Sequence, residues 1–220
     1  MANIVITGAN RGIGLELARQ LAGRGDEVIA VCRTPSEELE ALGVRIEPGV
    51  DVTSDEAVRE LEKKLDGLPI DVLLLNAGIL GRDGLDDLDL DEVRRQIEVN
   101  AIGPLRVAAA LRGHLGEGSK IAIITSRMGS IADNTSGGYY GYRMSKAAVN
   151  MAGVSLAHDL KDRGVAVGIL HPGFVATRMT GNRGTVQPAD AAAQLIARID
   201  ELSLESTGSF RHANGESLPW

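Results

Sequence analysis

The chain has 220 residues, 44% of them hydrophobic and 24% charged, a balance typical of globular rather than disordered or membrane-spanning proteins. Its formal net charge of −7 argues against a nucleic-acid partner. The single cysteine, Cys32, excludes an intrachain disulfide and a multi-cysteine zinc site, and it suits a reducing compartment. No apolar run approaches the roughly 20 residues of a membrane span, and the first residues lack a signal-peptide pattern. We therefore expect a cytoplasmic protein with no membrane partner.

Short apolar runs alternate with longer amphipathic segments along the whole chain. The runs predict strands at residues 3–7, 27–32, 44–48, 71–76, 120–126 and 165–170, with a weaker one near 207–211. Between them, helices are predicted at about 12–24, 35–42, 54–66, 90–115, 140–163 and 188–202. Several strands are apolar throughout, as expected when both faces of a parallel sheet are covered. The sequence therefore predicts an α/β fold with a doubly wound, Rossmann-type parallel sheet, in a single domain over residues 1–220.

The first predicted strand runs into a glycine-rich turn, TGANRGIG, at residues 7–14. The turn does not match the common G-x-G-x-x-G pattern, because its glycines stand at positions 8, 12 and 14. It still meets the requirements of a dinucleotide site: a tight turn, close approach of the backbone to a pyrophosphate, and a helix N-terminus at the anion. A glycine-rich turn after a first strand can also serve purely as a turn, so this stretch alone is a weak indication.

The second predicted strand ends in Cys32-Arg33, without the acid that would accept the ribose 2′-hydroxyl of NAD. Arg33 could hold a 2′-phosphate instead, and Arg11 in the glycine-rich turn could add a second positive charge. Both could equally be ordinary surface arginines. Asp51 and Val52, after the third strand, are placed to meet the adenine. The sequence thus predicts a preference for NADP(H) over NAD(H).

All three tyrosines of the chain, Tyr139, Tyr140 and Tyr142, lie within four positions. Residues four apart share one face of a helix, and only Tyr142 has a lysine, Lys146, at that spacing. A phenol with the usual pKa of about 10 exchanges protons poorly at neutral pH, and a fixed ammonium nearby lowers that pKa. Tyr142 is therefore the predicted general acid and base, with Lys146 as its partner.

Five short motifs, in their order and spacing, resemble the short-chain dehydrogenase/reductase family over nearly the whole chain. They are TGANRGIG at 7–14, NAG at 76–78, VNAIGP at 99–104, YRMSK at 142–146 and HPGFVAT at 171–177. The stretch 125–151 and the GESLPW at 215–220 further resemble the C-factor-like and carbonyl-reductase-like members. The resemblance implies an oxidoreductase that interconverts carbonyls (aldehydes, ketones, diketones or quinones) and alcohols by hydride transfer. It also implies a homodimer or homotetramer.

The resemblance assigns roles to individual residues. Tyr142 matches the family's general acid and base, Lys146 the residue that binds ribose and lowers the pKa of the tyrosine, and Asn100 an asparagine that holds a water in the proton relay. Asn76 could instead only bind neighbouring backbone. The expected cofactor contacts are Gly8, Asn10, Arg11, Gly12, Ile13, Gly14, Arg33, Asp51, Val52, Asn76, Ala77, Gly78, Tyr142, Lys146, Pro172, Gly173, Val175 and Thr177.

This sequence departs from the family at the hydroxyl that orients the substrate, which usually stands thirteen residues before the tyrosine. That position is Gly129, which has no side chain to offer. Ser126 stands thirteen before Tyr139, which lacks the lysine, and it ends a predicted strand at the ligand edge of the sheet. We therefore assign Ser126 to Tyr142, with a three-residue expansion of the loop between them. Ser130 remains the alternative.

The segment that forms the family's lid is short here, with about ten residues between Thr177 and the next predicted helix. This indicates an open pocket that tolerates small or medium carbonyls. Its walls are expected from Ile79, Met128, Phe174 and Met179. No metal site is expected: the four histidines lack ligand spacing, and the acidic run 83–92, read as a solvated loop before a helix, lacks the glycine that a calcium loop needs.

A second class of function stays open at this point. C-factor-like members are associated with developmental signalling, so the chain could bind NADP(H) as a signalling or sensor protein with little turnover. A pure sensor has no need for a serine, an asparagine, a tyrosine and a lysine of the catalytic type together. The joint presence of Ser126, Asn100, Tyr142 and Lys146 therefore favours the enzyme.

Overall fold

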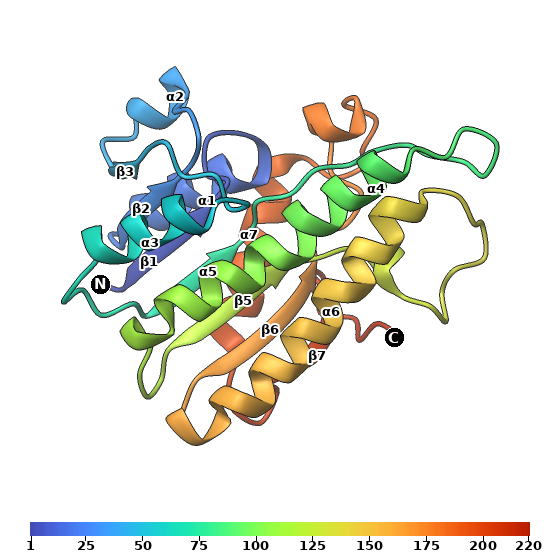
Figure 1. Cartoon of the computed structure of the whole chain (residues 1–220). Coiled ribbons are helices and arrows are strands. Elements are labelled where there is room, and N and C mark those ends of the chain that lie inside the picture. Colours follow the sequence, from blue (N-terminus) through green and yellow to red (C-terminus); the bar gives the residue numbers. More distant parts are fainter.

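The computed structural model describes all 220 residues, and its seven strands form one sheet in the order β3-β2-β1-β4-β5-β6-β7 (Figure 1). The strands are β1 (Asn3–Thr7), β2 (Glu27–Val31), β3 (Arg45–Glu47), β4 (Val72–Leu75), β5 (Lys120–Ile124), β6 (Ala166–His171) and β7 (Ser209–His212). Every neighbouring pair is parallel. The predicted α/β fold with a doubly wound parallel sheet is confirmed, including the weak seventh strand.

Helices cover both faces of this sheet. They are α1 (Gly12–Gly23), α2 (Glu37–Glu40), α3 (Asp55–Lys64), α4 (Leu90–Ile97), α5 (Gly103–Leu111), α6 (Tyr140–Leu160) and α7 (Pro188–Glu201). α3, α5 and α6 pack on one face, whereas α1 and α7 pack together on the other (Figure 1). None of these helices is both long and apolar enough to cross a membrane.

The hydrophobic core lies in two layers, one on each side of the sheet. Successive residues of one strand enter opposite layers: Leu73 and Leu75 pack toward α3 and α5, and Val72 and Leu74 pack toward α1 and α7. All four residues of β4 are buried for this reason. The continuous apolar runs of the sequence are thus explained by strands with two covered faces.

The direction of strand order reverses between β1 and β4, since the chain first runs outward to β3 and then returns. In open α/β sheets, ligands bind in the crevice that such a reversal leaves at the carboxyl ends of the strands. The glycine-rich turn after β1 and the NAG segment after β4 both lie at this edge. The fold therefore places these motifs on two adjacent strands.

The predicted single helix over 90–115 is interrupted in the structure. α4 ends at Ile97, a π-helical turn follows at Glu98–Ile102, and the chain then enters α5. Pro104 stands at the start of α5 and has no N–H to donate to the preceding turn. This missing donor explains why the α-helical hydrogen-bond pattern does not continue through the segment that contains Asn100.

Candidate active site

The glycine-rich turn can be occupied only by glycine at its critical positions. Gly8 and Gly12 have φ angles of 67° and 55°, which glycine adopts without steric cost. A Cβ on Gly14 would overlap the carbonyl oxygen of Gly8. α1 starts at Gly12, so the free N–H groups of its first turn face this edge of the sheet. The glycines allow a pyrophosphate to approach the backbone closely, and the helix N-terminus offers it N–H donors. The turn therefore fits the pyrophosphate of a dinucleotide.

Asn76 connects this turn to β4. Its Nδ2 donates to the carbonyl oxygens of Thr7 at 3.0 Å and Gly8 at 3.2 Å. The backbone N–H groups of Asn76 and Ala77 donate to Thr7 Oγ1 at 3.0 and 3.2 Å. The side chain of Asn76 is therefore used to hold backbone in place, which is the simpler of the two interpretations given above.

Two arginines lie beside the turn with open guanidinium groups. Asn10 in the turn donates to the carbonyl oxygen of Thr34 at 2.8 Å, which fastens the turn to the chain after β2. The side chain of Arg33 is 70% exposed, and its Nη1 lies 3.7 Å from Asp51 Oδ2. Burial opposes ionisation of Asp51, but hydrogen bonds and the charge of Arg33 lower the pKa of this carboxyl. Arg11 forms no ion pair, and the guanidinium of Arg33 is largely exposed beside Asp51. Both arginines can therefore bind a further anion.

Tyr142, Lys146 and Ser126 come together at the end of β5 and the first turns of α6. The Ser126 hydroxyl lies close enough to the Tyr142 phenol to act on its pKa, and Lys146 Nζ lies 5.7 Å from the centre of the Tyr142 ring. Burial raises the pKa of Tyr142 to about 12, against the effect of the Ser126 hydroxyl. Burial also lowers the pKa of Lys146 to about 8. Burial thus shifts both pKa values toward the neutral form, although a lysine with a pKa of about 8 is still charged at neutral pH.

The pKa of Tyr142 differs in direction from the sequence-based expectation that Lys146 lowers it. The physical reason is burial, because desolvation of the phenol is the largest influence on its pKa and only the Ser126 hydroxyl acts to lower it. The ammonium of Lys146 donates instead to the carbonyl oxygen of Ile124 at 3.0 Å. A molecule that enters the site and removes Lys146 from Ile124 would change this balance.

The alternative hydroxyl, Ser130, has other partners. Its Oγ donates to the carbonyl oxygen of Trp220 at 3.1 Å and accepts from the backbone N–H of Asp133 at 3.1 Å. Ser126 is the serine that contacts the Tyr142 side chain. The geometry therefore favours Ser126 over Ser130 as the hydroxyl beside the tyrosine.

The other two tyrosines lie outside this group. Tyr139 precedes α6 in a left-handed conformation with φ of 53°, and Tyr140 is exposed. Asp83 fixes the start of the helix, because its carbonyl oxygen accepts from the N–H of Tyr139 at 2.8 Å and its Oδ2 accepts from Gly141 at 3.0 Å. Asp83 thus sets the position from which Tyr142 projects.

Sequence reasoning missed this role of Asp83. We expected the acidic run 83–92 to be a solvated loop before a helix, and most of it is exposed, with Asp89 capping α4. Asp83 alone is an exception and is buried. Nothing in its own sequence neighbourhood distinguishes it from the other acids of the run, because its partners lie more than fifty residues away.

Asn100 lies in the π-helical turn, and its side-chain amide is hydrogen-bonded within the protein. Its Oδ1 accepts from the N–H of Ile79 at 2.8 Å, and its Nδ2 donates to the carbonyl oxygen of Ile79 at 2.9 Å and to Ser145 Oγ at 3.0 Å. The residue is only 1% exposed. Both amide N–H groups are taken, so a water could meet this residue only as a donor, for instance to its backbone carbonyl. That carbonyl lacks its usual partner four residues later, because residue 104 is proline.

The segment after β6 folds back toward the glycine-rich turn. Gly173 has a φ of 89°, and Phe174 begins a loop that its own hydrogen bonds close. The Phe174 carbonyl oxygen accepts from the N–H of Val186 at 3.0 Å. Thr177 lies close to the turn, since its methyl would be 3.4 Å from a Cβ on Gly12. The expected nicotinamide segment and the expected pyrophosphate turn are therefore neighbours in space.

The four side chains expected to wall the substrate pocket come from three segments beside the catalytic group. Ile79 is bound through its backbone to Asn100, and Met128 follows Ser126 by two residues. Both are half-buried, whereas Phe174 and Met179 are exposed. On the side of Phe174 and Met179, the expected wall is open to solvent. Val175, a further expected cofactor contact, is buried.

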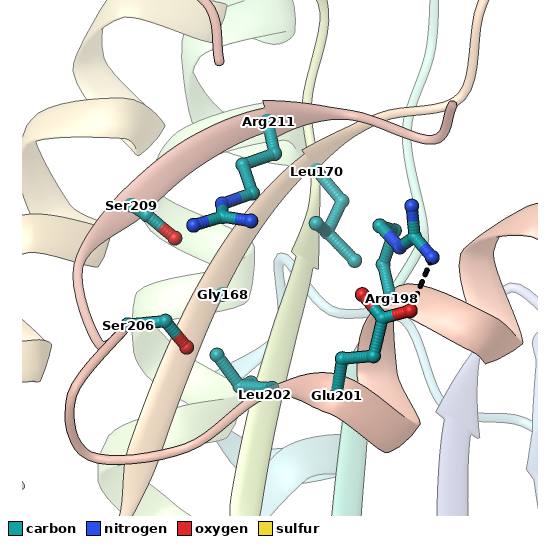
Figure 2. A pocket seen from close by; sticks show the side chains of 8 residues that line it. All are labelled: Gly168, Leu170, Arg198, Glu201, Leu202, Ser206, Ser209 and Arg211. Atoms are coloured by element: carbon teal, nitrogen blue, oxygen red, sulfur yellow. Dashed lines mark hydrogen bonds and ion pairs between the residues drawn. The ribbon is translucent and has the colours of Figure 1, made fainter. Parts of the chain in front are cut away.

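A small cavity lies elsewhere, between β6, β7 and α7 (Figure 2). Its lining residues are Gly168, Leu170, Arg198, Glu201, Leu202, Ser206, Ser209 and Arg211. Its volume is about 20 Å³, roughly the space of one water molecule. It shares no residue with the predicted site and is too small for a carbonyl substrate.

A histidine pair near the site was also missed. His171 ends β6 directly before Pro172, and it is in register with His212 on β7, so their rings meet edge to face at 4.9 Å. Burial, together with the positive potential around His212, Arg127 and Lys146, lowers the pKa of His171 to about 3. Its Nδ1 is buried without a partner. The only available signal was that each histidine follows one of the last two predicted strands.

The fold and this arrangement of side chains define a nucleotide-binding α/β oxidoreductase. A family model described as short chain dehydrogenase matches residues 2–187. The chain therefore belongs to the short-chain dehydrogenase/reductase family of oxidoreductases.

Curated relatives and solved structures agree with this assignment. The chain is 47% identical over 226 residues to the 1-hydroxy-2-glutathionyl-2-methyl-3-butene dehydrogenase of Rhodococcus sp., with 100% of both chains covered. It is 44% identical over 155 residues to the C-signal of Myxococcus xanthus, covering 69% of this chain and 93% of that one. The carbonyl reductase Sniffer of D. melanogaster superposes with a TM-score of 0.93 at 28% identity, with 100% of both chains covered. The NADPH-bound carbonyl reductase from chicken fatty liver has a TM-score of 0.89 at 27% identity, covering 100% and 99%.

Proposed function

We propose that this protein is an NADP(H)-dependent reductase that interconverts a carbonyl compound and its alcohol. The observation that carries the proposal is the meeting of Ser126, Tyr142 and Lys146 at the ligand edge of the sheet. Membership of an oxidoreductase family and likeness to carbonyl reductases support the class of reaction. In this proposal the whole chain, residues 1–220, acts as one nucleotide-binding unit.

Tyr142 is the proton donor of the proposed reduction. Because burial raises the pKa of Tyr142 to about 12, the phenol carries its proton across the physiological range, as a general acid must. Ser126, beside the same side chain, binds the carbonyl oxygen and stabilises the negative charge that develops on it. A bound nicotinamide cofactor would supply the hydride to the carbonyl carbon. The proton and the substrate oxygen are thus held by two neighbouring hydroxyls.

Lys146 and Asn100 support the return of the proton. The ammonium of Lys146 stabilises the phenolate that Tyr142 leaves behind after donation. Asn100 lies next to it, since a Cβ on Gly78 would be 3.2 Å from Asn100 Oδ1 and 3.7 Å from Lys146 Nζ. The Asn100 carbonyl, which lacks the donor that Pro104 cannot supply, would hold the water that reprotonates the pair through Lys146.

The preference for NADP(H) rests on Arg33 and Arg11. Arg11 has no ion pair, and Arg33 pairs only with Asp51 at 3.7 Å while its side chain stays 70% exposed. A 2′-phosphate could therefore accept from both guanidinium groups. Support comes from the similar carbonyl reductase that carries NADPH. The comparison of dissociation constants for NADPH and NADH tests this: an equal or tighter constant for NADH would contradict it.

A second candidate concerns substrate and direction. The Rhodococcus relative, 47% identical along its whole length, is named as a dehydrogenase of a hydroxy compound that bears a glutathionyl group. Oxidation of an alcohol of that kind with NADP⁺ is the second candidate for this chain. The catalytic residues serve both directions, so only the substrate distinguishes them.

A signalling role without turnover is the contrasting proposal, and the likeness to the C-signal of M. xanthus is its support. The experiment that separates these proposals measures absorbance at 340 nm with purified protein. NADPH is offered with aldehydes, diketones and quinones, and NADP⁺ with a glutathionyl alcohol. Turnover in either direction supports the enzyme and identifies the better substrate class. Tight NADPH binding without any turnover supports the sensor.

A homodimer or homotetramer is part of the same proposal. Large apolar side chains are exposed along the two helical segments that carry the site. They are Ile102 at the end of the π-helical turn, Leu105 in α5, and Met144 and Met151 in α6. Such surfaces are commonly covered by another chain. Size-exclusion chromatography with light scattering tests this, and a monomeric mass at micromolar concentration would contradict it.

A further inference from the structure

The segment 214–220 folds back along the last strand of the sheet. The Glu216 carbonyl oxygen accepts from the N–H of His212 at 2.8 Å, and the N–H of Leu218 donates to the carbonyl oxygen of Phe210 at 2.9 Å. The indole of Trp220 stacks on the ring of Phe210 with centroids 5.2 Å apart and an angle of 26° between the rings. The backbone of Trp220 is therefore held in a fixed place beside β7 (Figure 1).

From this place the segment contacts the loop that follows Ser126. The carbonyl oxygen of Trp220 accepts two hydrogen bonds from the loop, from Ser130 Oγ at 3.1 Å and from the N–H of Ala132 at 2.8 Å. Arg127 adds an ion pair, with its Nη2 3.1 Å from Glu216 Oε1. The segment thus meets the loop at three residues.

These contacts are the main external support of the loop. Apart from the two bonds to Trp220, residues 130–135 form no hydrogen bond to residues outside the loop. Residues 131–137 are exposed. Closer to the site, Gly129 packs on α6, since a Cβ there would be 2.7 Å from the carbonyl carbon of Lys146. The loop is therefore tied to α6 through Gly129 and Ser136, which accepts from Arg143, and to the segment 214–220 through Trp220.

We propose that the segment 214–220 positions the catalytic serine, by holding the loop 127–133 so that the Ser126 hydroxyl keeps its place beside Tyr142. Met128, an expected wall of the substrate pocket, lies between Arg127, which pairs with Glu216, and Gly129, which packs on α6. The catalytic consequence rests on the proposed function. The fastening of the loop itself is independent of turnover and can be measured without it.

Trp220→Ala tests this proposal, with Trp220→Phe as the conservative variant and Ser136→Ala as the matched control. Ser136 lies in the same loop, accepts from Arg143, and does not touch the segment. Hydrogen–deuterium exchange of peptides over 127–136 reports the loop directly. We expect Trp220→Ala to raise uptake there by about tenfold in rate, because its backbone contacts open more often. Trp220→Phe, which retains an aromatic ring against Phe210, should restore uptake close to that of the wild type.

The kinetic arm measures KM and kcat for the best carbonyl substrate and the dissociation constant of NADPH. Misplacement of the serine in Trp220→Ala should raise KM or lower kcat by about tenfold, with NADPH affinity changed less than about twofold. Unchanged uptake over 127–136 would overturn the fastening, and raised uptake with unchanged KM and kcat would overturn the positioning. If the wild type turns over no substrate, the proposed function fails, and the uptake arm alone decides whether the segment fastens the loop.

Discussion

Gly129 lies directly against the backbone of Lys146: a Cβ on Gly129 would be 2.7 Å from the lysine carbonyl carbon and 2.8 Å from its carbonyl oxygen. Gly129 occupies the position, thirteen residues before Tyr142, where the family usually has a hydroxyl. No side chain fits there in this chain, because the loop packs its backbone on α6 at that point. We therefore propose that the substrate-orienting role passes to Ser126, whose hydroxyl lies beside the Tyr142 phenol.

A serine at position 129, where the family usually has a hydroxyl, should therefore lower both the stability and the activity of this protein. Gly129→Ser is expected to lower the free energy of unfolding by about 1–3 kcal/mol, since a side chain must displace the backbone of α6 at Lys146. Activity should fall with it, because Lys146 moves. Urea denaturation and turnover of the variant check this. A variant that is as stable as the wild type and more active would show that the loop is arranged differently.

Substitution of Ser126 and substitution of Ser130 should have different effects on kcat. Ser126→Ala removes a donor to the developing charge, and we expect kcat to fall by about 10²–10³-fold. Ser130→Ala loses only its bonds to Trp220 and Asp133, so its kcat should stay within about tenfold of the wild type. Steady-state assays of both variants on one carbonyl substrate measure this. The reverse order of effects would move the catalytic role to Ser130.

The pH dependence of reduction should report Lys146 rather than Tyr142. The lowered pKa of Lys146, about 8, means that its positive charge is present at neutral pH and lost as the pH rises through 8. The rate of carbonyl reduction should then fall, by up to about tenfold per pH unit, because the phenolate loses its stabilising charge. The phenol, with its pKa raised to about 12, stays protonated over this range. A rate that stays constant up to pH 10 would contradict this assignment.

His171 should make the fold sensitive to acid. Its pKa is about 3 in the folded protein against 6.5 in the unfolded chain. The stability that this difference contributes is fully present above pH 6.5. It is lost as the pH falls below that value, by up to about 1.4 kcal/mol per pH unit, because only the unfolded chain takes up the proton.

Chemical denaturation at pH 7.5, 6 and 5 measures that slope. In His171→Asn the fall between pH 6.5 and 5 should be smaller than in the wild type. His158→Asn is the control, because His158 is an exposed residue of α6 and its removal should leave the slope unchanged. Equal slopes in the wild type and both variants would exclude His171 as the source.

The fold was predictable because its causes are local. A strand such as β4, buried on both faces, must be apolar throughout, and that pattern is visible in four consecutive residues. The pairing of Tyr142 with Lys146 was predictable for the same reason, since the spacing of a helix brings them together. The π-helical turn at Asn100 was not recognised, although Pro104 is a signal for it that lies in the sequence.

Other features depend on contacts between distant segments. Gly129 is required by the backbone of α6, Asp83 is buried by the start of the same helix, and His171 meets His212 only through the pairing of two strands. The pKa values of Tyr142 and Lys146 follow from burial, which the spacing of charges alone does not reveal. These features needed the three-dimensional arrangement.

The most direct test of the account compares Tyr142→Phe with Tyr139→Phe. Both remove one hydroxyl from nearby positions, but only the Tyr142 phenol lies beside Ser126. NADPH oxidation with the best carbonyl substrate, together with the NADPH dissociation constant, is measured for both. We predict that Tyr142→Phe loses at least about 10²-fold in kcat while it still binds NADPH, and that Tyr139→Phe stays close to the wild type. Full turnover by Tyr142→Phe would contradict the central claim.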